Sequence, residues 1–205
     1  MNTLELFAGS RSFSKVADKL GHKTFTSDIE NFKNIDYVTD IFNFDTDKVP
    51  FKPDVVWASP PCTFFSVGSI GKHWNKDHTP KTENAKLGIK IVKKTLQIIE
   101  KLNPKYFIIE NPRGKLRKLN LIDAKTLKTV WYCTYGDKRA KPTDIWTNID
   151  QWLPKPVCHN GNRNCHHEVA PRGSQSGTQG LKSSYEKSKV PEQLCEDILN
   201  SIRIF

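Results

Sequence analysis

The sequence predicts an α/β protein with a parallel sheet, and two observations support this prediction. Short apolar runs typical of buried strands alternate with segments of helical spacing through the first half of the chain. A strand, a helix and a further strand in that order favour parallel strands joined by right-handed crossovers. A chain of 205 residues suits one such domain, or one domain with a small appendage.

The first strand–helix–strand unit is predicted at the N-terminus. Residues 3–7 form a short apolar run, which the turn around Gly9 ends. Residues 12–20 place apolar side chains on one helix face, and Gly21 follows where a helix C-cap residue is typical. Residues 23–27 then have the pattern of the second strand.

The centre of the chain continues the same alternation. Residues 54–58 are a continuous apolar run, typical of a buried parallel strand. Residues 86–102 are the clearest helix, with apolar residues mainly on one face and lysines mostly opposite, and Pro104 stops it. Residues 106–109 are predicted as the next buried strand.

The second half is less regular. Residues 124–134 have the pattern of a helix leading into a strand around residues 130–133, and residues 145–148 that of another short strand. Residues 154–180 are rich in Pro, Gly, Asn, Ser and His, which predicts loops, and so long an irregular stretch is either functional or mobile. Residues 190–204 return to helical spacing.

The chain is basic, with 32 Lys and Arg against 22 Asp and Glu, a formal net charge of +10. This charge favours a polyanionic partner, nucleic acid first, although a lysine-rich proteome would produce the same balance. No stretch approaches the length of a membrane span and the N-terminus lacks a secretory pattern, so we expect a cytoplasmic or nucleoid-associated protein that is not secreted. The five cysteines are predicted to be reduced thiols.

A strand-to-helix turn with the sequence LFAGSRSFS ends the first strand. Such a turn presents backbone N–H groups at a helix N-terminus, where a carboxylate or phosphate can bind. Asp28 ends the second strand, and an acid at that position can bind the ribose hydroxyls of a nucleotide-like cofactor. The turn lacks the three-glycine dinucleotide fingerprint, so an ordinary turn with a surface Asp is an equal alternative.

Two further loops follow predicted strands and carry reactive groups. Cys62, in ASPPCTFFS, lies at the carboxyl end of a strand, and two prolines stiffen the loop before it. A thiol there is a nucleophile if basic surroundings lower its pKa, whereas a lone buried cysteine is more often structural. Glu110, in FIIENPRG, leaves the next strand at the same edge, as an acid–base partner of the thiol or as a loop contact.

Taken together, these segments resemble the DNA cytosine-5 methyltransferase family, whose ordered motifs are a Phe-Ala-Gly turn, a Pro-Cys loop, a Glu-Asn loop and an Arg-rich strand. The resemblance covers about residues 3–148 and a C-terminal segment. It implies a Rossmann-like parallel-sheet methyltransferase fold that uses S-adenosylmethionine. Residues 1–148 would be the catalytic domain, residues 149–187 a reduced recognition region, and residues 188–205 a helix returning to the catalytic domain.

The resemblance also implies the site residues. Cys62 would be the nucleophile at carbon 6 of cytosine, Glu110 would hold ring nitrogen 3 and the exocyclic amine, and Arg139 would position the base. Asp28 would bind the ribose and Ile29 the adenine. The positions that match cofactor contacts in the family are Phe7, Ala8, Gly9, Ser12, Asp28, Ile29, Asp40, Ile41, Pro61, Leu87 (Ile91 aligns equally well) and Ser188.

The expected substrate is cytosine in DNA, flipped out of the stack or single-stranded. Candidate nucleic-acid contacts are Ser66, Lys72, Lys141 and Arg172, and Lys141 stands where the family has a second Arg. Because the region before the last motif is short, a protein partner is a possible source of sequence specificity.

The segment CHNGNRNCHHE holds thiols and imidazoles close together in the sequence. The predicted reaction requires no metal, yet Cys158, Cys165 and His166 are possible zinc ligands. Their spacing matches no standard zinc signature, and a polar loop with reduced thiols is the alternative.

Three other functions are compatible with the sequence. They are an RNA cytosine-5 methyltransferase with the same residues, a cofactor- or nucleic-acid-binding module without turnover, and an unrelated nucleotide-binding α/β protein with a structural Pro-Cys. The last would bind no S-adenosylmethionine.

Overall fold

The computed structural model describes residues 1–170, 181 and 183–202. Over these residues the chain forms a seven-stranded sheet in the order β3-β2-β1-β4-β5-β7-β6. The strands are β1 (Asn2–Leu6), β2 (Lys23–Asp28), β3 (Tyr37–Val38), β4 (Val55–Ala58), β5 (Tyr106–Pro112), β6 (Leu127–Trp131) and β7 (Pro142–Thr147). Strands β1 to β5 are parallel, whereas β7 runs antiparallel to both β5 and β6.

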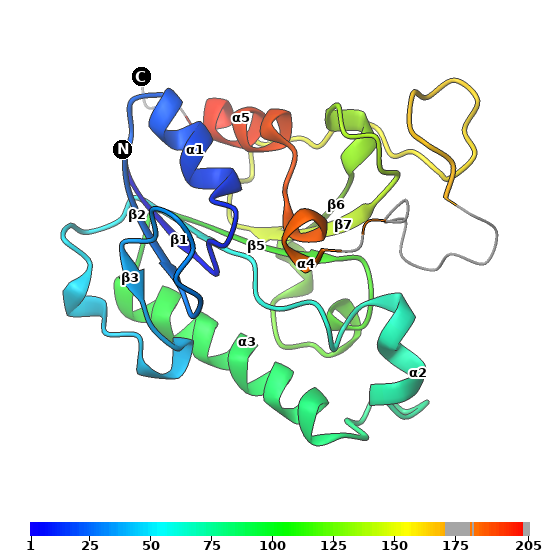
Figure 1. Cartoon of the computed structure of the whole chain (residues 1–205), viewed down its shortest axis with the longest axis horizontal. Coiled ribbons are helices and arrows are strands. Elements are labelled where there is room, and N and C mark those ends of the chain that lie inside the picture. Colours follow the sequence, from blue (N-terminus) through cyan, green and yellow to red (C-terminus); the bar gives the residue numbers. More distant parts are fainter. Residues whose placement is uncertain (171–180, 182, 203–205) are drawn as a thin grey trace.

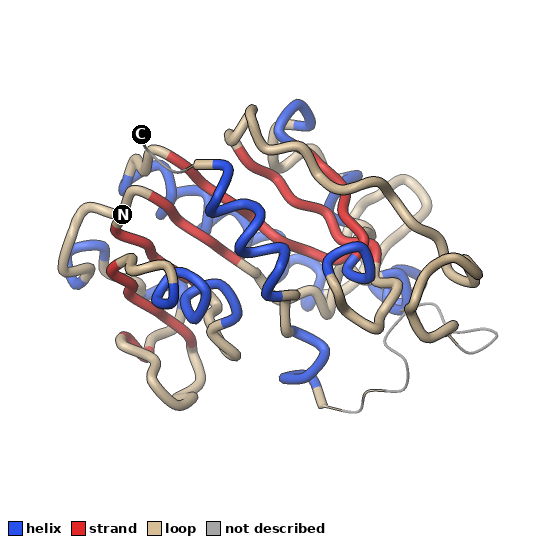
Figure 2. Tube along the Cα trace, turned by 90° about the horizontal axis from the view of Figure 1, so that it is seen from above, coloured by secondary structure: helices blue, strands red, loops and turns tan. Residues whose placement is uncertain are grey.

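Helices cover both faces of the sheet. Figure 1 shows α1 (Ser12–Lys19) and α5 (Glu192–Ser201) over one face and α3 (Glu83–Leu102) over the other. The other two α-helices of the described residues, α2 (Ile70–His73) and α4 (Ser184–Ser188), are short. Seen from above, the strands form a twisted row with helices on either side (Figure 2). This arrangement is the predicted Rossmann-like α/β fold.

Two hydrophobic cores follow from the alternation of side chains along the strands. On the first face Trp57 of β4 stacks on Phe13 of α1 with ring centroids 4.9 Å apart, and Leu194 of α5 joins them. On the other face Val56 packs in a cluster with Val92 of α3. The cores fix α1 and α3 against the sheet, and with them the loops that connect the helices to the strands.

The two main helices are confirmed, with the predicted boundaries except that α3 begins at Glu83 rather than at residue 86. Gly21 has φ +77° directly after α1, and its N–H donates to the Asp18 carbonyl, which ends the helix. At the start of α3, Thr82 Oγ1 accepts a hydrogen bond of 3.2 Å from the Ala85 N–H. Asn103 closes α3 in a left-handed conformation.

The second half of the chain corrects two predictions. The expected helix at the start of residues 124–134 is a single 3-10 turn at Ala124–Thr126, and the expected strand around residues 130–133 begins earlier, as β6 at Leu127–Trp131. Thr129 and Val130 are β-branched, and pairing with β7 completes their backbone hydrogen bonds. The sheet is consequently mixed rather than wholly parallel, and its short strand β3 was not predicted.

Residues 154–170 form neither helix nor strand, as predicted, and residues 171–180 of the expected loop lie outside the described residues. In the part of the chain that the structure describes, no helix has the length and apolar character needed to cross a membrane.

Candidate active site

The parallel strands bring three loops to one edge of the sheet. Leu6 of β1 pairs with Ala58 of β4, and Ala58 pairs with Ile109 of β5. The turn that begins at Phe7, the Pro-Cys loop and Glu110 of β5 therefore lie side by side at this edge. Ligands of open α/β sheets bind at this edge.

The turn after β1 has an unusual backbone. Phe7, Gly9 and Arg11 have φ values of 59°, 40° and 55°. A left-handed conformation costs a residue other than glycine about 1–3 kcal/mol, and it persists where the surroundings hold it. The Gly9 N–H donates a hydrogen bond of 2.9 Å to Asp28 Oδ2, which ties the turn to the end of β2. The turn is thus held in one shape between two strands.

Glu5, which the sequence analysis did not single out, lies beneath this turn. Its carboxylate accepts hydrogen bonds from the backbone N–H groups of Phe13 (3.3 Å) and Ser14 (2.8 Å) at the start of α1. Burial raises the pKa of Glu5 to about 7, although these hydrogen bonds and Arg11 oppose the rise. The sequence signal that could have identified Glu5 is an acidic residue between the apolar Leu4 and Leu6.

The Pro-Cys loop is anchored from several sides. The Asn111 side-chain amide donates to the Pro60 carbonyl at 2.8 Å, and Asn111 itself is fully buried. The Cys62 carbonyl accepts from the N–H groups of Phe65 and Ser66, both at 2.9 Å. The loop therefore turns back on itself directly after Cys62, which fixes the backbone that carries the thiol.

The Glu-Asn-Pro loop packs against the same turn through Gly114. A Cβ atom there would lie 2.3 Å from the Phe65 carbonyl oxygen, so only glycine permits this approach. The next residue, Lys115, donates its backbone N–H to that carbonyl at 2.7 Å. Trp74 after α2 donates its indole N–H to the Phe64 carbonyl at 2.6 Å.

Glu110 is buried and is held by one tyrosine. The Tyr132 hydroxyl donates a hydrogen bond of 2.9 Å to Glu110 Oε1. Burial raises the pKa of Tyr132 well above its ordinary value, and the Glu110 charge adds to the rise. Tyr132 thus stays neutral and acts as a hydrogen-bond donor that orients the carboxylate.

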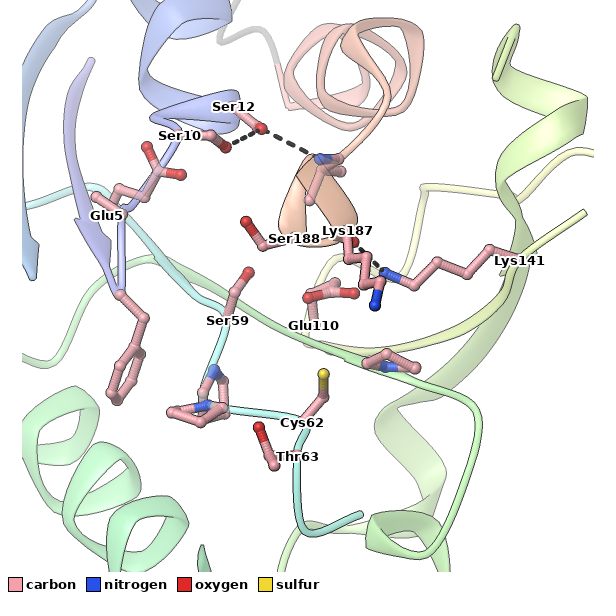
Figure 3. A pocket seen from close by; sticks show the side chains of 16 residues that line it. Glu5, Ser10, Ser12, Ser59, Cys62, Thr63, Glu110, Lys141, Lys187 and Ser188 are labelled. Atoms are coloured by element: carbon pink, nitrogen blue, oxygen red, sulfur yellow. Dashed lines mark hydrogen bonds between the residues drawn. The ribbon is translucent and has the colours of Figure 1, made fainter. Parts of the chain in front are cut away.

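These segments enclose a cavity of about 420 Å³. Figure 3 shows the Cys62 sulfur and the Glu110 carboxylate directed into it, with the Lys141 side chain reaching in from the right beside Lys187. Of the predicted residues, eight line the cavity: Phe7, Ala8, Ser12, Pro61, Cys62, Glu110, Lys141 and Ser188. Residues that line it without having been predicted include Glu5, Ser10, Ser59 and Lys187. A nucleophile, a carboxylate and the turn after β1 therefore share one cavity.

The surroundings of Cys62 shift the pKa of its thiol in both directions. Burial raises the pKa of the Cys62 thiol above its ordinary value, and the Glu110 carboxylate adds to this. The cations of Lys141 and Lys187 lower it. Thiolate formation in this cavity therefore depends on the two lysines.

The structure distinguishes between the two basic residues of the Arg-rich segment. Arg139, expected to position the base, does not line the cavity. Its guanidinium pairs with Asp137 and donates to the carbonyls of Lys187 (3.2 Å) and Lys189 (3.0 Å). Lys141 is buried in the cavity wall instead and donates to the Lys187 carbonyl at 3.2 Å.

The remaining predicted cofactor contacts, Gly9, Asp28, Ile29, Asp40, Ile41 and Leu87, do not line the cavity. Ile29, directly after β2, is 62% exposed, and Leu87 in α3 is 40% exposed. Asp40 accepts from the Phe42 N–H at 2.8 Å at the start of a 3-10 turn, and Ile41 within that turn is buried. Exposed apolar side chains of this kind are compatible with a flat aromatic ligand.

The residues predicted to contact nucleic acid or zinc differ in their burial and in whether they lie together. Ser66 is half-buried directly after the Pro-Cys loop, and Lys72 is exposed on α2. Arg172 lies outside the described residues. Cys158 and Cys165 come together, but the exposed His166 directs Nε2 to the Asp137 carbonyl at 3.1 Å.

Comparison with known proteins gives consistent matches. A family model described as C-5 cytosine-specific DNA methylase matches residues 1–131. A protein of Frog virus 3 (isolate Goorha), named "Probable DNA (cytosine-5)-methyltransferase", is 31% identical over 220 residues, which cover 98% of this chain and 99% of that protein.

A solved structure has the same fold. It is described as a "putative DNA modification methyltransferase encoded within prophage" (E. coli), with a TM-score of 0.51 and 14% identity. The match covers 78% of this chain and 52% of that one, so this chain spans about half of its length. On the family model and the near full-length relative, the chain belongs to the C-5 cytosine-specific DNA methylase family.

Proposed function

We propose that this chain transfers a methyl group from S-adenosylmethionine to carbon 5 of cytosine in DNA through a covalent Cys62 adduct. The observation that supports this most directly is the shared cavity, into which both Cys62 and Glu110 point. Membership of the C-5 cytosine-specific DNA methylase family supports the same reaction and the DNA substrate.

The residues around the cavity fit S-adenosylmethionine, which supplies an electrophilic methyl group when bound. Pockets for small molecules and cofactors measure about 300–1,000 Å³, and this cavity falls in that range. The hydroxyls of Ser12 and Ser188 suit the amino-acid part of the ligand. Each Asp28 oxygen accepts one backbone N–H, from Gly9 or Glu30, and keeps a lone pair for a ribose hydroxyl. Exposed Ile29 suits the adenine face.

In the proposed reaction the Cys62 thiolate bonds to carbon 6 of cytosine, and the ring electron pair moves toward carbon 5. Glu110 stabilises the resulting ring by hydrogen bonding at nitrogen 3 and the exocyclic amine. Carbon 5 takes the methyl group from the sulfonium, with S-adenosylhomocysteine as the leaving group. A base then removes the carbon 5 proton, and the bond between carbon 6 and the Cys62 sulfur breaks to release the thiolate and restore the aromatic ring.

Lys141 takes the place in this reaction that the sequence analysis gave to Arg139. It lies in the cavity wall, it lowers the pKa of the thiol, and its ammonium is within reach of a base bound between Cys62 and Glu110. Arg139 supports the site from behind by holding the segment that carries Lys187.

The test is methyl transfer from labelled S-adenosylmethionine to duplex DNA, single-stranded DNA and RNA, followed by identification of the labelled nucleoside. We expect 5-methyldeoxycytidine, and no product from Cys62→Ala. Cys195→Ala, which removes a buried thiol outside the cavity lining, keeps the activity. Label in 5-methylcytidine alone would move the substrate to RNA. Absence of label together with absence of cofactor binding by calorimetry would overturn the proposal.

A further inference from the structure

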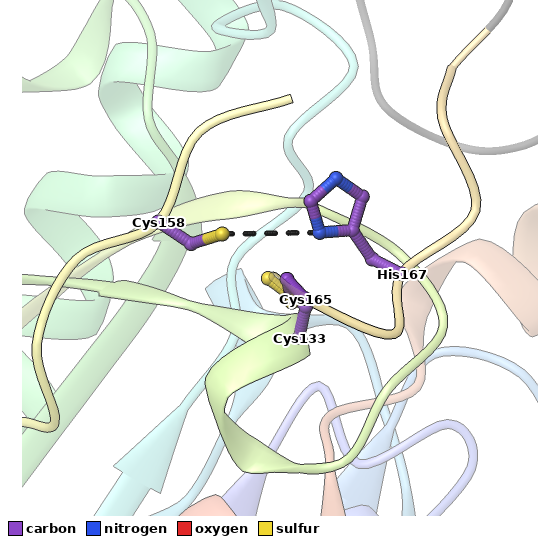
Figure 4. Close-up of side chains that lie close together, drawn as sticks. All are labelled: Cys133, Cys158, Cys165 and His167. Carbon is purple, nitrogen blue, oxygen red and sulfur yellow. Dashed lines mark hydrogen bonds between the residues drawn. The ribbon is translucent and has the colours of Figure 1, made fainter. Parts of the chain in front are cut away.

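A cluster of three thiols and one imidazole lies outside the cavity. Sγ of Cys133, Cys158 and Cys165 and a ring nitrogen of His167 all lie within 4.8 Å of one another. Figure 4 shows the four side chains converging on one point, with Cys158 Sγ facing His167 Nδ1 at 3.8 Å. Cys133 comes from the 3-10 turn after β6, and the other three residues come from the loop at residues 158–167.

We propose that these four residues bind one zinc ion, which fastens this loop to the catalytic domain. Three thiolates and one imidazole form a common structural zinc site, and soft sulfur ligands in tetrahedral geometry select zinc among available divalent metals. Zinc–sulfur bonds of about 2.3 Å place tetrahedral ligand atoms roughly 3.8 Å apart. The observed cluster therefore needs to contract by about 1 Å at most.

The distribution of buried side chains around this loop supports the proposal, because apolar side chains are exposed there and candidate metal ligands are buried. Leu153, Val157 and Val169 are 80%, 70% and 64% exposed. Cys158 and His167, which lie between Val157 and Val169 in the chain, are only 7% and 6% exposed. Apolar side chains normally occupy the interior, whereas here an imidazole lies inside, with its nitrogens facing Cys158 Sγ and the Gly161 N–H. A metal ion between the buried ligands accounts for this arrangement.

The local apolar core is too small to hold the loop by itself. Its buried members are Cys133, Ala140 and Cys158, with Trp131 and Cys165 packed against them. Backbone pairing adds one contact, because the Glu168 N–H donates to the Lys138 carbonyl at 2.8 Å. Metal binding of this kind contributes directly to folding free energy, since the site does not exist in the unfolded chain. Four protein ligands leave no open position, so the ion would be structural.

Binding through His167 Nδ1 has one structural consequence. Nε2 now accepts the Gly161 N–H at 3.3 Å, and a metal on Nδ1 requires a proton on Nε2. Gly161 is exposed and has φ +80°, and a Cβ there would meet nothing within 4 Å. The Gly161 peptide therefore has space to turn away when the metal binds.

The proposed zinc site adjoins the candidate active site through one peptide bond. Cys133 follows Tyr132, whose hydroxyl orients Glu110. On the other side, Arg139 and Glu168 form a β-bridge, and His166 bonds to the Asp137 carbonyl. The ion would thus stiffen both ends of residues 132–139, the segment that leads from Tyr132 to Arg139.

The test begins with the full-length wild-type protein, purified under reducing conditions without chelator. We expect about one zinc per chain by mass spectrometry of the metal, and X-ray absorption with three sulfur ligands and one nitrogen. This measurement requires no variant, so misfolding cannot obscure it. A protein without zinc, even after incubation with zinc sulfate and removal of the excess, would overturn the proposal. A disulfide among these cysteines, trapped by alkylation at cell lysis, would do the same.

A matched pair of histidine variants identifies the ligand set. His167→Asn is expected to lose the zinc, and His166→Asn to keep it, because only His167 faces the thiols. Cys165→His, which conserves a ligand, is expected to retain metal, whereas Cys165→Ser loses it. Zinc loss from His166→Asn but not from His167→Asn would refute the site. Cys62→Ala is expected to keep its zinc, so this result is independent of methyl transfer.

Discussion

Tyr132 donates a hydrogen bond of 2.9 Å to Glu110, and this contact connects the antiparallel part of the sheet to the candidate active site. Tyr132 follows β6, whereas Glu110 lies in β5. Two cations lie over the Tyr132 ring, with Lys141 Nζ 4.7 Å and the Arg139 guanidinium carbon 5.5 Å from its centroid. Tyr132 therefore contacts the carboxylate by its hydroxyl and both basic residues by its face.

Removal of this hydroxyl tests whether Glu110 must be oriented. A hydrogen bond to a charged group contributes about 1.5–3 kcal/mol, so Tyr132→Phe is expected to slow methyl transfer roughly 10- to 100-fold. Single-turnover rates with saturating DNA and cofactor measure the effect. Tyr135→Phe serves as the control, because its hydroxyl bonds to Asp197 and the Lys155 N–H and not to Glu110. Equal rates in wild type and Tyr132→Phe would contradict the assigned role.

The parallel half of the candidate site could be predicted from the sequence, and the antiparallel half could not. Cys62 and Glu110 follow continuous apolar runs, and parallel strands end at the same edge, so their meeting follows from local patterns. Tyr132 and Cys133 are placed by the pairing of β6 with β7, and the sequence indicated a strand around residues 130–133 but not its antiparallel partner. Arg139 and Lys141 are two residues apart, so the alternation of side chains along the chain treats them alike. The sequence therefore did not indicate which of the two lines the cavity.

Lys141 is expected to lower the pKa of the Cys62 thiol. In Lys141→Gln this cation is lost, so the thiol pKa rises further above its ordinary value and less thiolate is present at any neutral pH. Alkylation of Cys62 by iodoacetamide, followed by peptide mass spectrometry across a pH series, should shift to higher pH. Lys72→Gln removes an exposed lysine on α2 and should leave the profile in place. An unshifted profile in Lys141→Gln would refute the electrostatic role.

Gly114 should tolerate no side chain. The added Cβ of Gly114→Ala lies 2.3 Å from the Phe65 carbonyl oxygen, so the Pro-Cys loop must move. Overpacking of this kind costs about 1–3 kcal/mol, and denaturant unfolding should show a loss of that size together with slower methyl transfer. Gly71→Ala, in α2 with open space around the new Cβ, should be neutral or slightly stabilising. Similar behaviour of the two variants would show that the contact imposes no constraint.

Arg139 is expected to act on the C-terminal segment rather than on a bound base. Arg139→Gln leaves Asp137 without its buried partner, and breaking a buried pair costs about 3–5 kcal/mol. Hydrogen exchange should accelerate across residues 183–190, whose carbonyls the guanidinium contacts. Lys138→Gln removes an exposed cation whose pairing with Glu168 spans 3.8 Å, and should change little. Unaltered exchange in Arg139→Gln would contradict this assignment.

Glu5 should make stability depend on pH in the direction opposite to most carboxylates. Its folded pKa of about 7 exceeds the ordinary value of 4.5, so the folded protein favours the protonated form. The carboxyl group therefore destabilises the fold progressively as pH rises from about 4.5 to about 7, by roughly 3 kcal/mol in all. Glu5→Gln, which keeps an acceptor for the Ser14 N–H, should become more stable than wild type over this interval.

The measurement is the free energy of unfolding of both proteins at a series of pH values. Glu83→Gln provides a control of opposite sign. Glu83 is exposed in the first turn of α3, and the hydrogen bond and charge of Lys86 lower its pKa, so its removal should cost stability at neutral pH. A constant difference between wild type and Glu5→Gln across the series would show that burial does not shift Glu5. A difference that grows with pH would establish a buried carboxyl group beneath the turn after β1, neutral or charged according to pH in the cavity wall.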